Sequence, residues 1–129
     1  MMLGFRKQFE PFVSDRSKRH TIRAFRKDGK RWKPGMSCDC YGDSRQKTMH
    51  LLGRWKCRRV QLIRIEADHT GLVPNLLIWI DGVQLTADET EGLLYRDGFR
   101  SGDATAEAYR HWRKPLKKGP FEGELIHWE

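Results

Sequence analysis

The sequence lacks any long apolar run, and it contains few cysteines and prolines. A membrane-spanning helix needs about 20 consecutive, mostly apolar residues, and no stretch of this chain supplies them. The opening residues MMLGFRKQFE also lack the apolar core and the small-residue cleavage site of a secretory signal. We therefore expect no membrane partner and a cytoplasmic location. The length of 129 residues predicts a single domain that spans residues 1–129.

The three cysteines make a poor disulfide framework. The cysteines are Cys38, Cys40 and Cys57, and the first two are separated by only one residue. Because their number is odd, at least one of them would lack a disulfide partner. Reduced thiols are therefore the expectation. The chain also has none of the C-x-x-C or H-x-x-x-H type spacings that are typical of structural zinc sites. We expect no metal and no cofactor.

What the sequence has in excess is positive charge. Lys and Arg number 25 against 17 Asp and Glu, which gives a formal net charge of +8, and the sequence pI is near 9.7. A pI above about 9 is typical of nucleic-acid-binding domains. The charge is concentrated in residues 16–34, which contain Arg16, Lys18, Arg19, Arg23, Arg26, Lys27, Lys30, Arg31 and Lys33. Nucleic acid or another polyanion is the expected partner class, and a merely soluble basic surface is the alternative.

Alternation of apolar and polar residues predicts most of the strands. We expect strands over residues 3–9, 19–25, 37–42, 57–67 and 75–82, and a last strand in which Ile126 and Trp128 share one face. A short helical turn and a loop should follow the first strand. Two turn-forming pairs, DG and PG, predict an exposed basic loop or hairpin over residues 26–36. Gly53 indicates another turn.

Two short helices are predicted before the last strand. Thr86 is a plausible N-cap with Glu89 three residues later, which is the spacing of a capping box, so a helix should run over residues 87–96 and end near Gly98. The second helix should begin near Ser101 or Asp103 and end at Pro115. Strands do not alternate with helices as they do in parallel sheets. We therefore expect an α+β fold built on a curled, mostly antiparallel sheet or barrel.

The segment KRHTIR places Lys18, Thr21 and Arg23 at the spacing K-x-x-T-x-R. Side chains two positions apart on a strand point to the same side, so Thr21 and Arg23 should face one cleft, with Lys18 at its rim. His20, Ile22 and Ala24 should then lie on the opposite face of the strand. Burial lowers the pKa of a lysine, and a neutral amine can act as a general base toward a hydroxyl group. The alternative is an ordinary strand threonine flanked by surface charges.

The pattern around this segment resembles the G-x-K-x-x-T-x-R signature of the activating signal cointegrator homology (ASCH) domain, a relative of the PUA RNA-binding fold. The segments KPGMSCDCY, LLYRDGF and GPFEGELIHWE are also similar to elements of that family, so the resemblance extends from about Phe5 to Trp128. It implies a PUA-like β-barrel of mostly antiparallel strands, with the two short helices before the last strand.

The resemblance also implies a chemistry, because one ASCH branch consists of bacterial acetylcytidine amidohydrolases. Carried over to this chain, Thr21 would be the nucleophile, Lys18 its activator and Asp97 the carboxylate, while Arg23 would bind a substrate oxygen or phosphate. The family has glycine where this chain has Arg16, and that branch has glutamate where this chain has the shorter Asp97. A turn residue at the end of a helix is the alternative role for Asp97.

RNA binding without chemistry is the second reading. Trp32 and Trp55 lie within the basic stretches KRWK and GRWK, where an aromatic ring can stack on an unpaired base while neighbouring cations neutralise phosphates. Arg26, Lys30 and Arg31 would then belong to the RNA-binding surface. Core packing is the alternative role for both tryptophans. A basic adaptor that binds an acidic protein is a third reading. We expect a monomer.

Overall fold

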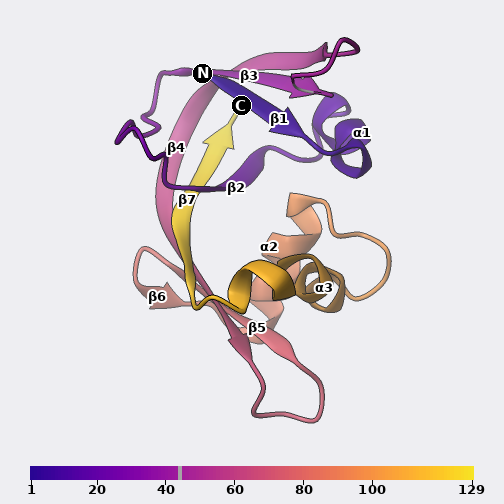
Figure 1. Ribbon diagram of the computed structural model, residues 1–129, viewed down its shortest axis with the longest axis vertical. Helices are drawn as coiled ribbons and strands as arrows, with labels where there is room; N and C mark the ends of the chain where they lie inside the picture. Colours follow the sequence, from indigo (N-terminus) through magenta and orange to yellow (C-terminus); the bar gives the residue numbers. More distant parts are fainter. Residues whose placement is uncertain (44) are drawn as a thin grey trace.

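The computed structural model describes residues 1–43 and 45–129 and consists of one mixed sheet with three α-helices and a 3₁₀ helix in these ranges (Figure 1). In chain order the elements are β1 Met2–Phe5, η1 Lys7–Phe9, α1 Glu10–Ser14, β2 His20–Ala24, β3 Ser37–Gly42, β4 His50–Asp68, β5 Asn75–Ile80, β6 Val83–Gln84, α2 Ala87–Asp97, α3 Ala104–Leu116 and β7 Phe121–Trp128.

Strand β4 connects the two parts of the sheet. Its 19 residues pair first with β3, then with β7 and finally with β5, always antiparallel. Strand β2 pairs with β7 in antiparallel fashion, and β1 pairs with β3 in parallel fashion. Figure 1 shows β4 as a long curved ribbon with β7 beside it. The predicted α+β fold with a mostly antiparallel sheet is confirmed.

The sheet stays open between β1 and β2. In the described ranges β1 pairs only with β3, and β2 pairs only with β7. Both are therefore edge strands, and no backbone ladder joins them. We call the gap between them the seam, because it is where the curled sheet would have to close to form a barrel.

The two predicted helices form through the expected caps. The Thr86 hydroxyl accepts a hydrogen bond from the Glu89 backbone N–H at 3.2 Å, and the Glu89 carboxylate accepts one from the Thr86 N–H at 2.9 Å. Asp103 caps α3 by accepting from the Ala106 N–H at 2.9 Å. Helices α2 and α3 lie together on one side of the lower part of the molecule (Figure 1). None of the helices in the described ranges is long and apolar enough to cross a membrane.

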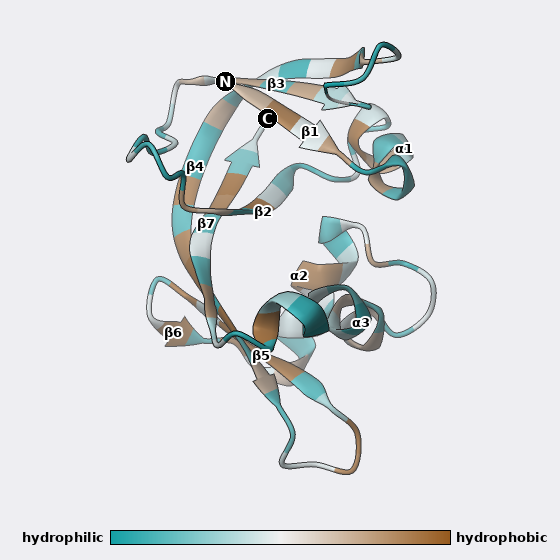
Figure 2. Ribbon diagram, viewed as in Figure 1, coloured by the Kyte–Doolittle hydropathy of each residue, from teal (hydrophilic) through white to brown (hydrophobic). Residues whose placement is uncertain are grey.

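The apolar core lies between the concave face of the sheet and the helices. Its fully buried members come from distant parts of the chain, and include Val13, Ile65, Ile78, Leu94 and Ile126. Figure 2 shows that apolar residues, in brown, alternate with more polar residues, in white and teal, along several of the strands. Both predicted central strands, now parts of β4 and β5, contribute to this core. Ile126 and Trp128, which alternation places on one face of the last strand, are both buried.

Two local predictions are wrong. The first strand ends at Phe5 and is followed by a 3₁₀ turn over Lys7–Phe9, because the spacing of Phe5 and Phe9 suits one face of a helical turn as well as a strand. Gly53 lies within β4, at a bulge opposite β3, and the Trp55 ring occupies the space that a Gly53 side chain would need. The prediction of an exposed loop or a hairpin over residues 26–36 is confirmed in its first form, since β2 and β3 do not pair.

Candidate active site at the sheet seam

A cavity of about 230 Å³ lies at the seam between the two edge strands. We call it the seam pocket. Strands β1 and β2 form two of its walls, and the end of α2 and the middle of α3 form the others. It is lined by Gly4, Phe5, Arg6, Phe9, Lys18, Thr21, Ile22, Arg23, Asp97, Phe99, His111 and Trp112.

Lys18 contributes the ammonium group of the seam pocket and is almost completely buried. Its backbone N–H donates to the Phe12 carbonyl at 2.9 Å, which anchors the residue just before β2. Its Nζ donates to Asp97 Oδ1 at 2.6 Å. The Nζ atom also lies 5.8 Å and 5.4 Å from the ring centroids of Phe5 and Phe9, which is within cation–π range. The lysine is thus held from several directions.

Asp97 reaches this pocket because α2 ends at that residue. The following residue, Gly98, adopts a left-handed conformation with φ of 118° and closes the helix. A Cβ atom at Gly98 would lie 2.5 Å from the Phe9 ring, so only glycine fits both the conformation and the space. Asp97 therefore has both of the roles considered from sequence, as a helix-end residue and as a partner of Lys18. The shorter side chain is sufficient for contact with the lysine.

Burial and charge act in opposite directions on this pair. Burial lowers the pKa of Lys18, while the neighbouring Asp97 carboxylate acts to raise it, and the net direction is downward. Burial acts to raise the pKa of Asp97, but Lys18 and His20 outweigh it and hold the pKa below its ordinary value. The Asp97 carboxylate therefore stays ionised, and the Lys18 amine loses its proton more readily than an exposed lysine would.

Thr21 and Arg23 lie side by side on β2, as alternation predicts. Arg23 Nε donates to Thr21 Oγ1 at 3.2 Å, and Arg23 Nη2 donates to the Gly4 carbonyl of β1 at 2.7 Å. The guanidinium carbon lies 5.0 Å from the Phe5 ring centroid. The Arg23 side chain thus bridges the seam that the backbone leaves open, and it presents Thr21 to the pocket in a fixed orientation.

The structure brings Lys18, Thr21, Arg23 and Asp97 into one pocket, and their catalytic roles remain a prediction. In the described ranges, Lys18 Nζ donates only to Asp97, and Thr21 Oγ1 accepts only from Arg23. A proton transfer from Thr21 to Lys18 would therefore need a rearrangement of these side chains, or a ligand that brings the two groups together. Catalytic hydrogen bonds often form only once the substrate is bound.

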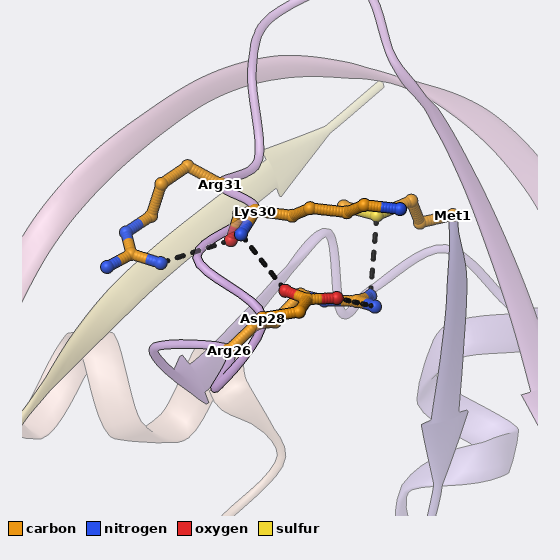
Figure 3. Close-up of polar contacts among 5 residues, drawn as sticks. All are labelled: Met1, Arg26, Asp28, Lys30 and Arg31. Carbon is orange, nitrogen blue, oxygen red and sulfur yellow. Dashed lines mark hydrogen bonds and ion pairs between the residues drawn. The ribbon is translucent and has the colours of Figure 1, made fainter.

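Arg26, Lys30 and Arg31 lie on the exposed loop after β2 and do not line the seam pocket. Arg26 Nη2 pairs with Asp28 at 2.8 Å, and this hydrogen bonding lowers the pKa of Asp28 to about 2 (Figure 3). Asp28 also accepts from the Lys30 N–H at 3.0 Å. The Arg26 charge is thus largely offset, whereas the ammonium of Lys30 and the guanidinium of Arg31 make no ion pair in the described ranges.

The structure corrects the stacking prediction for Trp32. This residue is buried in the core, and its backbone N–H donates to Glu124 Oε2 at 3.3 Å, so its ring is not offered to a base. Trp55 is half-buried. Its ring stacks on Trp128 at a centroid distance of 6.2 Å, and the Arg16 guanidinium lies 5.3 Å from its centroid. A base that stacked on Trp55 would compete with these contacts.

Sequence reasoning missed several residues of the site. Alternation predicts that His20 lies on the opposite face of β2, yet its Nε2 lies 3.3 Å from Asp97 Oδ1. Phe99, His111 and Trp112 line the pocket from the helical region, and no spacing in the sequence links them to Lys18. The only available signal was the clustering of aromatic residues in the segment YRHW of α3, which is equally typical of a core face.

The three cysteines are buried free thiols, and the described ranges contain no cluster of three or more potential metal ligands. Burial raises the pKa of Cys38 and of Cys40 to about 12, which keeps these thiols protonated and unreactive. Besides Arg6 and His111, the seam pocket offers the amine of Lys18, the hydroxyl of Thr21, the guanidinium of Arg23 and the carboxylate of Asp97.

Comparison with known proteins finds no matching family model, no matching curated protein and no matching solved structure.

The Lys18–Asp97 pair should show strong energetic coupling. We expect Lys18→Met and Asp97→Asn each to lower the free energy of unfolding by about 3 to 5 kcal/mol, because each leaves a buried charge without its partner. The double variant should lose much less than the sum of the two. Urea denaturation of the four proteins at pH 7 measures this cycle. Additive losses would show that the two groups do not interact in solution.

Proposed function

We propose that this chain is an ASCH-like domain with a PUA-like barrel topology that recognises RNA or a modified nucleoside in the seam pocket. The observation that carries the proposal is the buried Lys18–Asp97 pair at 2.6 Å, which opens on a cavity that also contains Thr21 and Arg23. A buried, paired lysine with a lowered pKa beside a hydroxyl group is an arrangement expected at functional sites.

The size and lining of the pocket favour a nucleobase as the bound group. Its volume of about 230 Å³ is below the range of about 300 to 1,000 Å³ that is usual for sites of drug-sized ligands. Aromatic rings from Phe5, Phe9, Phe99 and Trp112 supply apolar walls, and Arg23 supplies a hydrogen-bond donor. Unpaired bases are commonly held between aromatic rings with polar contacts at their edges.

Amide hydrolysis on an acylated base is the catalytic form of this proposal. The neutral Lys18 amine accepts the Thr21 hydroxyl proton while Oγ1 attacks the amide carbonyl. The C–N bond then breaks, and the leaving amine takes the proton from the Lys18 ammonium, which leaves an acyl ester on Thr21. Water, deprotonated by the same amine, attacks this ester. The bond between the acyl carbon and Thr21 Oγ1 breaks, Oγ1 takes the proton back from the Lys18 ammonium, and the carboxylic acid is released. Asp97 orients Lys18 throughout, and Arg23 remains charged and binds the substrate oxygen.

Recognition without chemistry is the alternative, and two contacts favour it. Thr21 Oγ1 accepts from Arg23 at 3.2 Å, and Lys18 Nζ is directed to Asp97 instead. In that case the same four side chains hold a base or a sugar in place, and the loop residues Lys30 and Arg31 contribute phosphate contacts. The exposed position of the loop suits this role.

Turnover tests the catalytic form directly. We expect the purified protein to release free nucleoside from acetylcytidine or from another acylated nucleoside in a small panel. Thr21→Val keeps the shape of the side chain without its hydroxyl and should lower kcat/KM by about 10⁴-fold or more. Thr21→Ser keeps the nucleophile and should retain measurable activity. Equal activity of the Val and Ser variants would exclude Thr21 as the nucleophile.

The pH dependence of turnover tests the role of Lys18. Activity requires the neutral amine, so kcat/KM should rise with pH and level off above an inflection that lies below the ordinary lysine value of about 10.4. Asp97→Asn removes the charge that favours the ammonium, so it should move the inflection to lower pH. An unmoved inflection in this variant would assign the titration to a different group.

Salt-dependent binding tests the recognition form. We expect a labelled single-stranded oligoribonucleotide to bind. Replacing Arg26, Lys30 and Arg31 together by glutamine should weaken binding and reduce the salt slope by about 2, because each phosphate that a cation neutralises adds about 0.7 to the slope. Arg26 should contribute least of the three because Asp28 offsets it. Fluorescence anisotropy at several salt concentrations measures both quantities. Affinity that does not change with salt would exclude an electrostatic contribution from this loop.

A further inference from the structure

A second pocket, of about 500 Å³, lies on the opposite side of His20 from the seam pocket. We call it the arginine pocket, because it is lined by Arg19, His20, Arg58, Arg59, Leu93, Arg96, His127 and Trp128. Arg19 lies just before β2, and the other residues come from β2, β4, α2 and β7. His20 lines the arginine pocket, and its Nε2 lies 3.3 Å from Asp97 Oδ1, so these two side chains stand between the pockets.

A β-bulge brings two of the arginines to the same pocket. Cys57 of β4 pairs with Trp128 and Arg59 pairs with His127, so Arg58 is an extra residue with no partner on β7. On a regular strand Arg58 and Arg59 would point to opposite faces. A bulge re-aims side chains locally, and here both residues line the arginine pocket.

The arginines of this pocket make no ion pair with a carboxylate in the described part of the chain. In residues 1–43 and 45–129, no carboxylate lies within ion-pair distance of Arg58, Arg59 or Arg96. Arg19 donates to the backbone carbonyl of Arg16 at 2.9 Å, a contact that does not offset its charge. By contrast, several arginines elsewhere, such as those at positions 26 and 64, have carboxylate partners.

One buried polar atom of the pocket lining, Nε1 of Trp128, lacks a hydrogen-bond partner within the described ranges. Nε2 of His20 lies 3.3 Å from Asp97 Oδ1 and is partnered by that carboxylate. The half-buried His127 ring is affected by the same cations. Burial, His20, Arg59, Arg58 and Arg96 together lower its pKa to about 4. A ligand that carries negative charge would relieve this repulsion.

We infer that the arginine pocket binds a phosphate group, carried by a nucleic-acid strand or by a free nucleotide. The planar guanidinium group matches phosphate oxygens through paired N–H donors, and several such groups around one site suit a multiply charged anion better than a single carboxylate. The volume of about 500 Å³ leaves room for the group that carries the phosphate. This inference does not depend on catalysis or base recognition in the seam pocket.

Pyrophosphate is the first probe, with NMR of the His127 and His20 rings as the local readout. We expect pyrophosphate to shift these ring resonances in a saturable way and to raise the pKa of His127, because the bound anion compensates the surrounding cations. Arg58→Gln combined with Arg59→Gln should weaken binding by about tenfold or more. Arg96→Gln, on a different element, should change the affinity in the same direction.

The matched control is Arg110→Gln combined with Arg113→Gln. This double variant also removes two positive charges, but from two residues of α3 that do not line the arginine pocket. It should leave pyrophosphate affinity within about twofold, since distant charges are screened by salt. Equal losses in both double variants would show diffuse attraction and overturn the inference. Unchanged His127 and His20 resonances at saturating pyrophosphate would also overturn it.

Two further titrations distinguish the sources of the phosphate. A short oligoribonucleotide and a nucleoside diphosphate are compared in the parent protein and in the Arg58 and Arg59 double variant. Tighter binding of the oligonucleotide, abolished in the variant, assigns the pocket to a nucleic-acid backbone, and tighter binding of the diphosphate assigns it to a free nucleotide. If the variant changes neither affinity, the pocket does not bind phosphate. None of these results depends on turnover at Thr21.

Discussion

The ion pair between Lys18 and Asp97 connects two parts of the chain that are 79 residues apart and does so in an almost water-free environment. Two charges in such surroundings interact strongly, and each would be costly without the other. The pair therefore fixes the end of α2 against the start of β2. Phe9, Gly98 and His20 pack around it, so the position of the whole α2 end relative to the sheet follows from this contact.

The open seam explains why a pocket exists at this place. A fully closed barrel of this size fills its interior with side chains. Here β1 and β2 do not form a ladder, and the Arg23 side chain spans the gap by donating to Gly4. The polar side chain takes the place of backbone pairing, and the space beside it remains accessible. The same arginine that joins the two edge strands also holds Thr21 at the pocket, so the fold and the site share one contact.

The distribution of charge in space differs from its distribution along the chain. The densest run of basic residues, around Arg26, includes an arginine that Asp28 largely offsets. The arginine pocket draws on residues from four separate elements and has no carboxylate partner for Arg58, Arg59 or Arg96 in the described part of the chain. Since His20 lies between the two pockets, a group bound on one side would act electrostatically on the other through His20 and Asp97.

The sequence by itself determined the elements whose signals are local. The Thr86 capping box, the alternation in β4 and β5, and the face shared by Thr21 and Arg23 all depend on neighbours within a few residues. The fold class followed from their order. Tertiary structure alone decided that Gly53 lies in a strand, that Trp32 is buried and that His20 meets Asp97, because each of these depends on a segment distant in the chain. The open seam and the convergence of the arginines also needed the folded chain, since strand pairing and bulges place side chains that no sequence spacing relates.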